Sequence, residues 1–282
     1  MSPVYRQFDR AELDREYSPS SCVADLAAEL AAYTEGSAAA HAAHPARRDE
    51  RYGEQPPELL DYFPAAGPGA PLHVFVHGGY WQELDKADSA FAAPDFLRRG
   101  TAFAAIGYGL APRWPPAEIV AQVRRAVRWL FGNAEELGFD PARVYLSGSS
   151  AGAHLAAMAL LDPEPAPGHR IAGAALLSGV YDLEPISLSY VNEPLALDAE
   201  AARRLSPLHL PLAGLPPLLI ARGEHETAEF ARQQEEFAAA ARAAGVPVHT
   251  MVAAGRNHFD LPLDLGRPES ELGAEVLGRF GA

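Results

Sequence analysis

The sequence contains very little cysteine and few basic residues. Cys22 is the one cysteine in 282 residues, which excludes an intramolecular disulfide. The 23 Lys and Arg residues are outnumbered by 37 Asp and Glu residues, so the formal net charge is −14. This charge repels a phosphate backbone, and no basic cluster offsets it locally. We therefore expect no nucleic-acid partner and no strongly anionic substrate.

Long apolar runs are also missing. No stretch approaches the roughly 18 consecutive apolar residues that a helix needs to span a bilayer. Residues 1–15 mix charged and aromatic side chains, unlike the apolar centre of a signal peptide. We therefore expect no membrane partner and a cytoplasmic location. What the chain does contain, 48% hydrophobic residues with 24 Gly and 25 Pro, is typical of a globular α/β protein with many turns.

From residue 71 onward, strand-like and helix-like stretches alternate. This order predicts a mostly parallel central sheet flanked by helices in a single domain over residues 1–282. Residues 1–58 are predicted to form an N-terminal helical segment. Prolines break the periodicity over approximately 180–215, which we interpret as a small cap inserted over the sheet. The expected strands are 59–63, 72–76, 102–106, 144–147, 174–177, 218–221 and 248–252, and the expected helices are 23–33, 117–131, 153–161, 229–244 and 270–280.

One short motif predicts a nucleophile. Ser150 is the central residue of Gly148-Ser149-Ser150-Ala151-Gly152, which matches G-x-S-x-G. A sharp turn from strand to helix forces the serine into a strained backbone conformation, and the flanking glycines leave room for that turn. The helix that follows points its positive dipole end at the reacting centre. A glycine-rich turn without chemistry is the alternative, but the strand before and the helix after favour a nucleophile.

A second glycine motif predicts an oxyanion hole. The sequence His77-Gly78-Gly79-Tyr80-Trp81 directly follows an apolar strand and lies upstream of the nucleophile. Hydrolases with the G-x-S-x-G turn carry a His-Gly-Gly loop at this point. We expect the amides of Gly78, Gly79 and Ala151 to bind the developing alkoxide. Each amide would stabilise the transition state by about 3 kcal/mol. A tight turn with an ordinary buried histidine is the alternative.

The position along the chain selects the catalytic base from ten histidines. In this type of hydrolase the nucleophile, acid and base follow one another in that order. His258 lies in the loop after the last expected strand and before the final helix, whereas His249 lies inside that strand. We therefore assign His258 as the base, with an exposed loop histidine as the alternative role.

The acid is expected in the loop that follows the strand 218–221. That loop contains two glutamates and no aspartate. We favour Glu226 as the acid, with Glu224 as the alternative. A glutamate orients the imidazole and stabilises its positive charge as an aspartate does. A surface charge is the other role open to either residue.

These motifs resemble the kynurenine formamidase (arylformamidase) family of α/β-hydrolases. The resemblance covers nearly the whole chain, and the segments around Trp81 and Tyr181 are its most specific parts. Family members often carry aspartate where Glu226 aligns. The segments that carry the resemblance are Leu13-Asp14-Arg15-Glu16-Tyr17-Ser18-Pro19, His77-Gly78-Gly79-Tyr80-Trp81-Gln82, Ser147–Leu155, Ser178–Ile186, Glu229–Gln234 and His258-Phe259-Asp260.

The resemblance implies an α/β-hydrolase fold and hydrolysis of N-formyl-kynurenine to kynurenine and formate, with a Ser150, His258 and acid triad and without a metal or cofactor. Because a formyl group is tiny, we expect a small pocket on the acyl side. Tyr80, Trp81, Tyr181 and Tyr190 are then candidates for the leaving-group side, and Asn192 for a polar contact to the substrate's amino acid end. Packing within loops or the cap is the alternative role for each.

Three other functions compete with this hypothesis. A carboxylesterase for small aryl or short-chain esters uses the same machinery, and a catalytically inactive binding protein uses the same fold. A metal-dependent deformylase is disfavoured because no set such as H-E-x-x-H occurs at metal-ligand spacing. The motifs do not determine the oligomeric state, although an exposed apolar cap is compatible with a homodimer.

Overall fold

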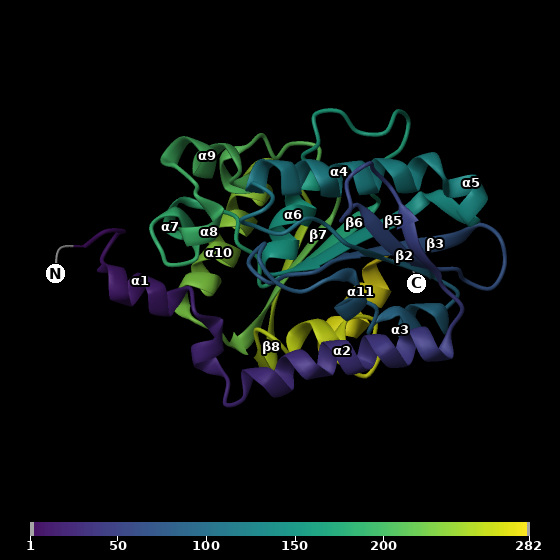
Figure 1. The fold of residues 1–282 in the computed structure, drawn as a ribbon, viewed down its shortest axis with the longest axis horizontal. Helices are drawn as coiled ribbons and strands as arrows, with labels where there is room; N and C mark the ends of the chain where they lie inside the picture. The colour runs from purple at the N-terminus through teal and green to yellow at the C-terminus, as the bar shows by residue number, and fades with distance from the viewer. Residues whose placement is uncertain (1–2, 281–282) are drawn as a thin grey trace.

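A single eight-stranded sheet runs through the molecule (Figure 1). The structure is a computed structural model that describes residues 3–280. The pairs β1–β2 and β2–β4 are antiparallel and the remaining pairs are parallel, which confirms the expected α/β class. In spatial order the strands are β1 (Arg47–Arg51), β2 (Leu59–Phe63), β4 (Ala102–Ile106), β3 (Ala70–Val76), β5 (Phe139–Ser149), β6 (Gly173–Leu177), β7 (Leu218–His225) and β8 (Val248–Asn257).

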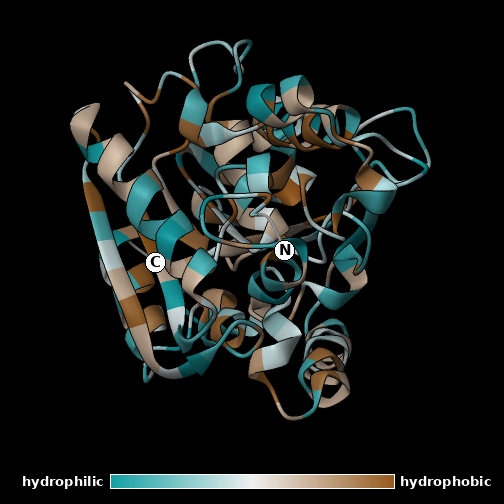
Figure 2. Ribbon diagram, turned by 90° about the vertical axis from the view of Figure 1, so that its left-hand side faces the viewer, coloured by the Kyte–Doolittle hydropathy of each residue, from teal (hydrophilic) through white to brown (hydrophobic). Residues whose placement is uncertain are grey.

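Helices cover both faces of this sheet and bury two apolar layers (Figure 1). The helices α4 (Pro116–Gly132), α6 (Ala151–Leu160) and α10 (Ala228–Ala243) pack on one face. On the opposite face lie α2 (Leu26–Ala43), α3 (Ala93–Leu97) and α11 (Glu271–Phe280). In Figure 2 hydrophobic and hydrophilic segments alternate along the outer helices, as expected when one side of each helix faces the sheet. The remaining helices are α1 (Arg10–Glu16), α5 (Ala134–Leu137), α7 (Glu184–Ser187), α8 (Asn192–Leu195) and α9 (Ala199–Arg204).

The strands β3, β4 and β6 are buried along their whole length because helices cover the sheet on both sides. Strands that are buried on both faces read as nearly continuous hydrophobic runs, which is why the sequence located β4 with its observed bounds. The antiparallel strand β2, of which residues 60–63 are buried, was also located with its observed bounds. The ends of β5, β7 and β8 extend beyond the predicted strands, because those ends carry polar residues.

The N-terminal region contains a strand that the sequence did not indicate. β1 has the sequence Arg-Arg-Asp-Glu-Arg and pairs with β2 at the edge of the sheet. Charged residues are common on edge strands, where they oppose pairing with a second chain, but they give no alternating apolar pattern. The expected helix over 23–33 is present as the longer α2. No helix within residues 3–280 combines the length and apolarity needed to cross a membrane.

The order of the strands creates the position of the site. The chain passes from β3 to its neighbour β4 and then returns across β3 to form β5 on the other side. Val76, at the end of β3, pairs with Gly148 near the end of β5. In open α/β sheets, ligands bind outside the carboxyl ends of strands at such a reversal. The two glycine motifs therefore leave the sheet side by side.

Candidate active site

Ser150 occupies a sharp turn between β5 and α6. Its backbone has φ 56° and ψ −120°, a conformation that is strained for a residue with a side chain. A Cβ on Gly148 would lie 2.2 Å from the carbonyl oxygen of Gly152, and a Cβ on Gly152 would lie 2.1 Å from that of Val76. The turn therefore requires glycine on both sides of Ser150, as the motif predicts.

The His77-Gly78-Gly79 loop lies directly against this turn. A Cβ on Gly78 would approach the Ser149 carbonyl oxygen to 2.8 Å and Cβ of Ser150 to 3.2 Å. Gly79 has a positive φ of 91°. Within residues 3–280 the amides of Gly78, Gly79 and Ala151 donate no hydrogen bond to another residue. All three donors therefore remain available to a bound anion beside Ser150.

His258 and Glu226 form a buried pair. Nδ1 of His258 lies 3.0 Å from Oε2 of Glu226, and their side chains are 4% and 0% exposed. The other carboxylate oxygen, Oε1, accepts hydrogen bonds from the Gly223 amide at 2.5 Å and the Ser178 hydroxyl at 2.6 Å. A carboxylate can only accept, so Nδ1 carries the proton and Nε2 is left as the basic nitrogen.

Glu224 occupies a different environment from Glu226. It is exposed, and its Oε2 accepts a hydrogen bond of 2.8 Å from the amide of Gly255. No hydrogen bond joins Glu224 to His258 within the described chain. The geometry therefore favours Glu226 over Glu224 as the partner of His258.

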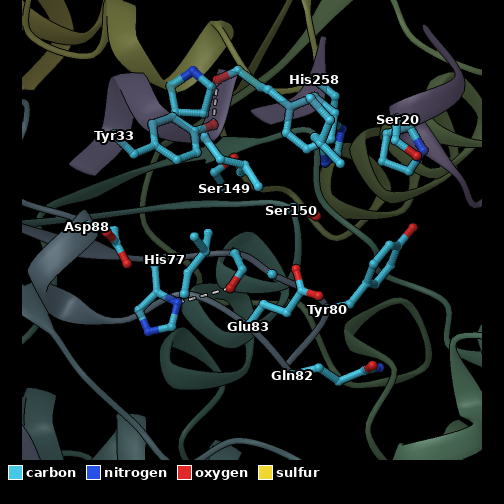
Figure 3. Close-up of a pocket in the computed structure, with 18 of the residues that line it drawn as sticks. Ser20, Tyr33, His77, Tyr80, Gln82, Glu83, Asp88, Ser149, Ser150 and His258 are labelled. Atoms are coloured by element: carbon cyan, nitrogen blue, oxygen red, sulfur yellow. Dashed lines mark hydrogen bonds between the residues drawn. The ribbon is translucent and has the colours of Figure 1, made fainter. Parts of the chain in front are cut away.

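Ser150 and His258 line the same cavity, which has a volume of about 250 Å³. Figure 3 shows His258, Tyr80 and Glu83 arranged around Ser150. Burial lowers the pKa of His77, which lines the cavity, to about 4, so its imidazole is neutral near pH 7. The other lining residues are Pro19, Ser20, Leu26, Leu30, Tyr33, Phe75, Gly78, Gly79, Gln82, Leu84, Asp88, Phe91, Ser149, Tyr190, Val191, Phe259 and Pro262.

The charged residues of the cavity are acidic. Glu83 is exposed and makes no ion pair with another described residue, and the Asp88 carboxylate accepts a hydrogen bond of 2.7 Å from Thr34. None of the described residues that line the cavity is Lys or Arg. The cavity therefore offers carboxylates to a cationic group and no fixed cation to an anionic one.

Two of the five expected substrate-binding residues line this cavity, namely Tyr80 and Tyr190. The Tyr80 hydroxyl donates to the Tyr17 carbonyl at 2.7 Å. Tyr190 is 41% exposed and its hydroxyl lies 3.2 Å from the Ser18 hydroxyl. Both tyrosines therefore connect the catalytic face to the N-terminal segment.

The other three, Trp81, Tyr181 and Asn192, do not line the cavity, contrary to expectation. Trp81 is 1% exposed, and its Nε1 donates to Nδ1 of His154 on α6 at 3.2 Å. Tyr181 is fully buried and stacks on Phe237 of α10, with ring centroids 4.1 Å apart. An aromatic side chain beside a motif can line a pocket or pack in the core. Because Trp81 and Tyr181 are buried against helices, both belong to the core.

Asn192 organises its own loop. Its side-chain amide donates to the carbonyls of Ser187 and Leu197, both at 2.9 Å, and its Oδ1 accepts from the Leu197 amide at 2.8 Å. These bonds satisfy most of its polar capacity. In the expected cap region, Tyr190 and Val191 are the described residues that reach the cavity.

The N-terminal segment supplies much of the cavity wall, which the sequence did not indicate. Leu26, Leu30 and Tyr33 of α2 line the cavity. The Tyr33 hydroxyl donates to the carbonyl of Phe259, next to His258 (Figure 3). The Asn257 side chain donates to Glu29 of α2 at 2.8 Å. The helix thus both lines the cavity and contacts the loop that carries His258.

Two further polar residues at strand ends were also missed. Ser178 directly follows β6 and contacts Glu226, and Tyr108 follows β4 and contacts the His77-Gly78 carbonyls. Both residues follow buried strands, and this position in the sequence could have identified them. The carboxyl ends of parallel strands lie at the same edge of the sheet, where the candidate site is located. Within residues 3–280, no group of three His, Cys, Asp or Glu side chains is arranged to hold a metal ion.

Comparisons with known proteins agree with this architecture. Residues 73–260 match a family model described as the alpha/beta hydrolase fold. The chain is 35% identical over 277 residues to a kynurenine formamidase from Danio rerio, with 91% of this chain and 92% of the relative covered. This chain belongs to the kynurenine formamidase family of α/β-hydrolases. Membership confirms the fold and the resemblance expected from the motifs.

This chain is also similar to proteins that are named as esterases. An isoprenylcysteine alpha-carbonyl methylesterase from Arabidopsis thaliana is 29% identical over 254 residues, which cover 79% of this chain and 60% of the relative. A Silicibacter crystal structure, provisionally described as a thioesterase, is 29% identical with a TM-score of 0.84. That comparison covers 96% of this chain and 99% of the other. The scaffold is therefore shared by proteins named for several acyl-transfer reactions.

Proposed function

We propose that this protein is an arylformamidase that hydrolyses N-formyl-L-kynurenine to L-kynurenine and formate. The observation that carries the proposal is the buried His258–Glu226 pair, whose histidine lines one cavity with Ser150 in a member of the kynurenine formamidase family. The candidate nucleophile Ser150, acid Glu226 and base His258 follow one another in the chain order expected of this fold, in which the acid orients the imidazole.

The reaction begins with attack of Ser150 Oγ on the formyl carbon. The hydroxyl proton passes to Nε2 of His258, and Glu226 stabilises the resulting imidazolium. The amides of Gly78, Gly79 and Ala151 bind the oxyanion of the tetrahedral intermediate. His258 then gives its proton to the aniline nitrogen, the C–N bond breaks, and L-kynurenine leaves a formyl ester on Ser150.

Water completes the cycle. His258 takes a proton from a water molecule whose oxygen attacks the formyl ester. The second tetrahedral intermediate collapses, the bond between the carbon and Ser150 Oγ breaks, and the proton returns to Ser150. An arylamine is a better leaving group than an alkylamine, so esterase-type machinery suffices for this amide.

The negative charge of the cavity is complementary to the positively charged α-ammonium group of this substrate. Glu83 and Asp88 are the carboxylates of the described cavity lining. Glu83 has no ion-pair partner among the described residues and is therefore our candidate for the substrate α-ammonium. A charge-assisted hydrogen bond of this kind contributes about 1.5–3 kcal/mol.

Hydrolysis of N-formyl-L-kynurenine by the purified protein tests the proposal. We expect an increase in kynurenine absorbance with a kcat/KM at least a hundredfold above that for p-nitrophenyl acetate, and no turnover by Ser150→Ala. If only the ester is hydrolysed, the named substrate is wrong.

A carboxylesterase for small aryl or short-chain esters is the second candidate. The predominantly apolar wall formed by Leu26, Leu30 and Phe91, together with the named methylesterase relative, supports it. The same pair of assays separates the two functions, because the preferred substrate reverses.

A further inference from the structure

Tyr108 contacts the His77-Gly78-Gly79 loop and does not line the cavity that contains Ser150. It is 3% exposed and follows β4, the neighbour of β3 in the sheet. Its hydroxyl lies 2.7 Å from the carbonyl oxygen of His77 and 3.1 Å from that of Gly78. A carbonyl oxygen can only accept, so the phenol donates its one proton toward this pair of carbonyls.

The Gly78 carbonyl has a second donor. Nδ1 of His77 lies 3.0 Å from it, and the rings of His77 and Tyr108 stack with centroids 4.0 Å apart and planes inclined by 9°. Burial keeps the pKa of Tyr108 well above its usual value, so the phenol stays protonated. Two consecutive carbonyls are thus fixed by donors on one side of the loop.

Because each peptide unit is planar, a donor that fixes a carbonyl oxygen also fixes the direction of the N–H group in the same unit. In a trans peptide the N–H points away from the carbonyl oxygen of the same unit. The carbonyl of His77 belongs to the peptide that contains the Gly78 amide, and the carbonyl of Gly78 to the peptide that contains the Gly79 amide. Neither peptide is cis, so fixing the two oxygens toward Tyr108 directs both N–H groups away from it. A Cβ on Gly78 would lie 3.2 Å from Cβ of Ser150, so the loop is next to the nucleophile, and neither amide has another acceptor within residues 3–280.

We propose that Tyr108 is a positioning residue, whose hydroxyl holds the carbonyls of His77 and Gly78 so that the Gly78 and Gly79 amides point at the oxyanion. Without this donor the His77 carbonyl loses its side-chain partner and the Gly78 carbonyl keeps only Nδ1 of His77, so both peptides can rotate more freely, since glycine imposes few limits on its own backbone. The inference rests on the proposed serine-hydrolase chemistry but not on the formamide substrate, so it is testable with any ester that the enzyme cleaves.

The test compares Tyr108→Phe with the wild-type enzyme. The substitution retains the ring stack on His77 and removes only the hydroxyl. Loss of one oxyanion donor lowers kcat by ~100- to 1000-fold, and misdirection of two donors is expected to lower kcat for p-nitrophenyl acetate by at least about tenfold with KM within about twofold. The affinity for phenylboronic acid, whose serine adduct places an oxygen in the oxyanion position, should fall by a similar factor.

Tyr52→Phe is the matched control. Tyr52 is 6% exposed, and its hydroxyl donates to the Gly107 carbonyl at 2.6 Å, beside Tyr108 but not in the oxyanion loop. Its removal should lower thermal stability as Tyr108→Phe does while leaving kcat and boronate affinity unchanged. A second variant, His77→Phe, removes the other donor to Gly78 and should weaken boronate binding in the same direction.

The outcomes separate this inference from the proposed function. A folded Tyr108→Phe enzyme with wild-type kcat and boronate affinity would overturn the positioning role, whatever the substrate. Equal loss of kcat in Tyr108→Phe and Tyr52→Phe would also overturn it, because the effect would then follow stability. Failure to cleave N-formyl-L-kynurenine, with ester hydrolysis and the Tyr108 effect intact, would overturn only the substrate assignment.

Discussion

The hydroxyl of Ser178 donates a 2.6 Å hydrogen bond to Oε1 of Glu226. The opposite oxygen of the same carboxylate contacts His258, so the serine and the histidine hold this carboxylate from two sides. Glutamate has one more rotatable bond than aspartate and would lose orientation without such support. The Ser178 contact accounts for the use of a glutamate at this position.

Glu226→Gln is expected to lower kcat by ~10⁴-fold, because an amide no longer stabilises the imidazolium or fixes the correct tautomer. Glu224→Gln is the matched control and should retain wild-type kcat, since Glu224 is exposed and contacts Gly255. Steady-state ester and formamide hydrolysis would measure both variants. The reverse result would move the acid to Glu224.

Ser178→Ala is expected to lower kcat about tenfold and leave KM nearly unchanged, because the carboxylate loses one of its two supporting donors. The Gly223 amide still holds the group, so the loss should remain far below that of Glu226→Gln. Ser187→Ala, which removes a hydroxyl bonded to the Glu184 carbonyl, serves as the control. Unaltered turnover in Ser178→Ala would show that the carboxylate is fixed without it.

Glu83→Gln is expected to raise KM for N-formyl-L-kynurenine about tenfold, since a neutral amide loses the charge that attracts the substrate ammonium. The KM for uncharged p-nitrophenyl acetate should not change. Glu193→Gln, an exposed glutamate of α8 that does not line the cavity, controls for net charge. An equal rise for both substrates would argue against recognition of the ammonium.

Three buried histidines predict loss of stability in acid. Burial lowers the pKa of His73 to about 3 and those of His77 and His154 to about 4, so the unfolded chain binds more protons below pH 6.5. The free energy of unfolding should therefore fall as the pH is lowered from about 6.5 to 4, by up to roughly 3 kcal/mol for each histidine. Urea unfolding at several pH values measures this slope.

His73→Phe supplies the corresponding variant. It retains a ring against Phe96, which lies 4.1 Å from the His73 ring between centroids, and removes the titrating group. The slope should become shallower by about one proton, whereas His225→Gln, at an exposed position, should leave it unchanged. Identical slopes in His73→Phe and wild type would contradict the assignment to buried histidines.

The sequence predicted the sheet and the glycine loops well because both depend on local patterns. β2 and β4 are short, mostly apolar runs with clear ends, and Gly148 is required because a Cβ there would meet the Gly152 carbonyl within the same five residues. Gly152 is required because a Cβ there would meet the Val76 carbonyl at the end of β3. The edge strand β1 was missed because its charged side chains give no alternation.

The contacts of side chains across the fold were less predictable. Trp81 and Tyr181 were expected in the pocket because they adjoin the motifs. Instead, Trp81 packs against α6 and Tyr181 against α10. Residues 26–33 lie far from the motifs in sequence and gave no signal of their contact with the His258 loop. Such contacts depend on where α2 crosses the sheet, which no local pattern records.

The contact between Tyr33 and the Phe259 carbonyl has a consequence for engineering. The helix α2 lines the cavity and also contacts the loop that carries His258, so we expect substitutions in this helix to change both substrate range and turnover. Grafting the corresponding segment from a relative onto this chain would therefore alter both properties at once. Independent tuning of selectivity must use positions such as Glu83, which face the cavity without supporting His258.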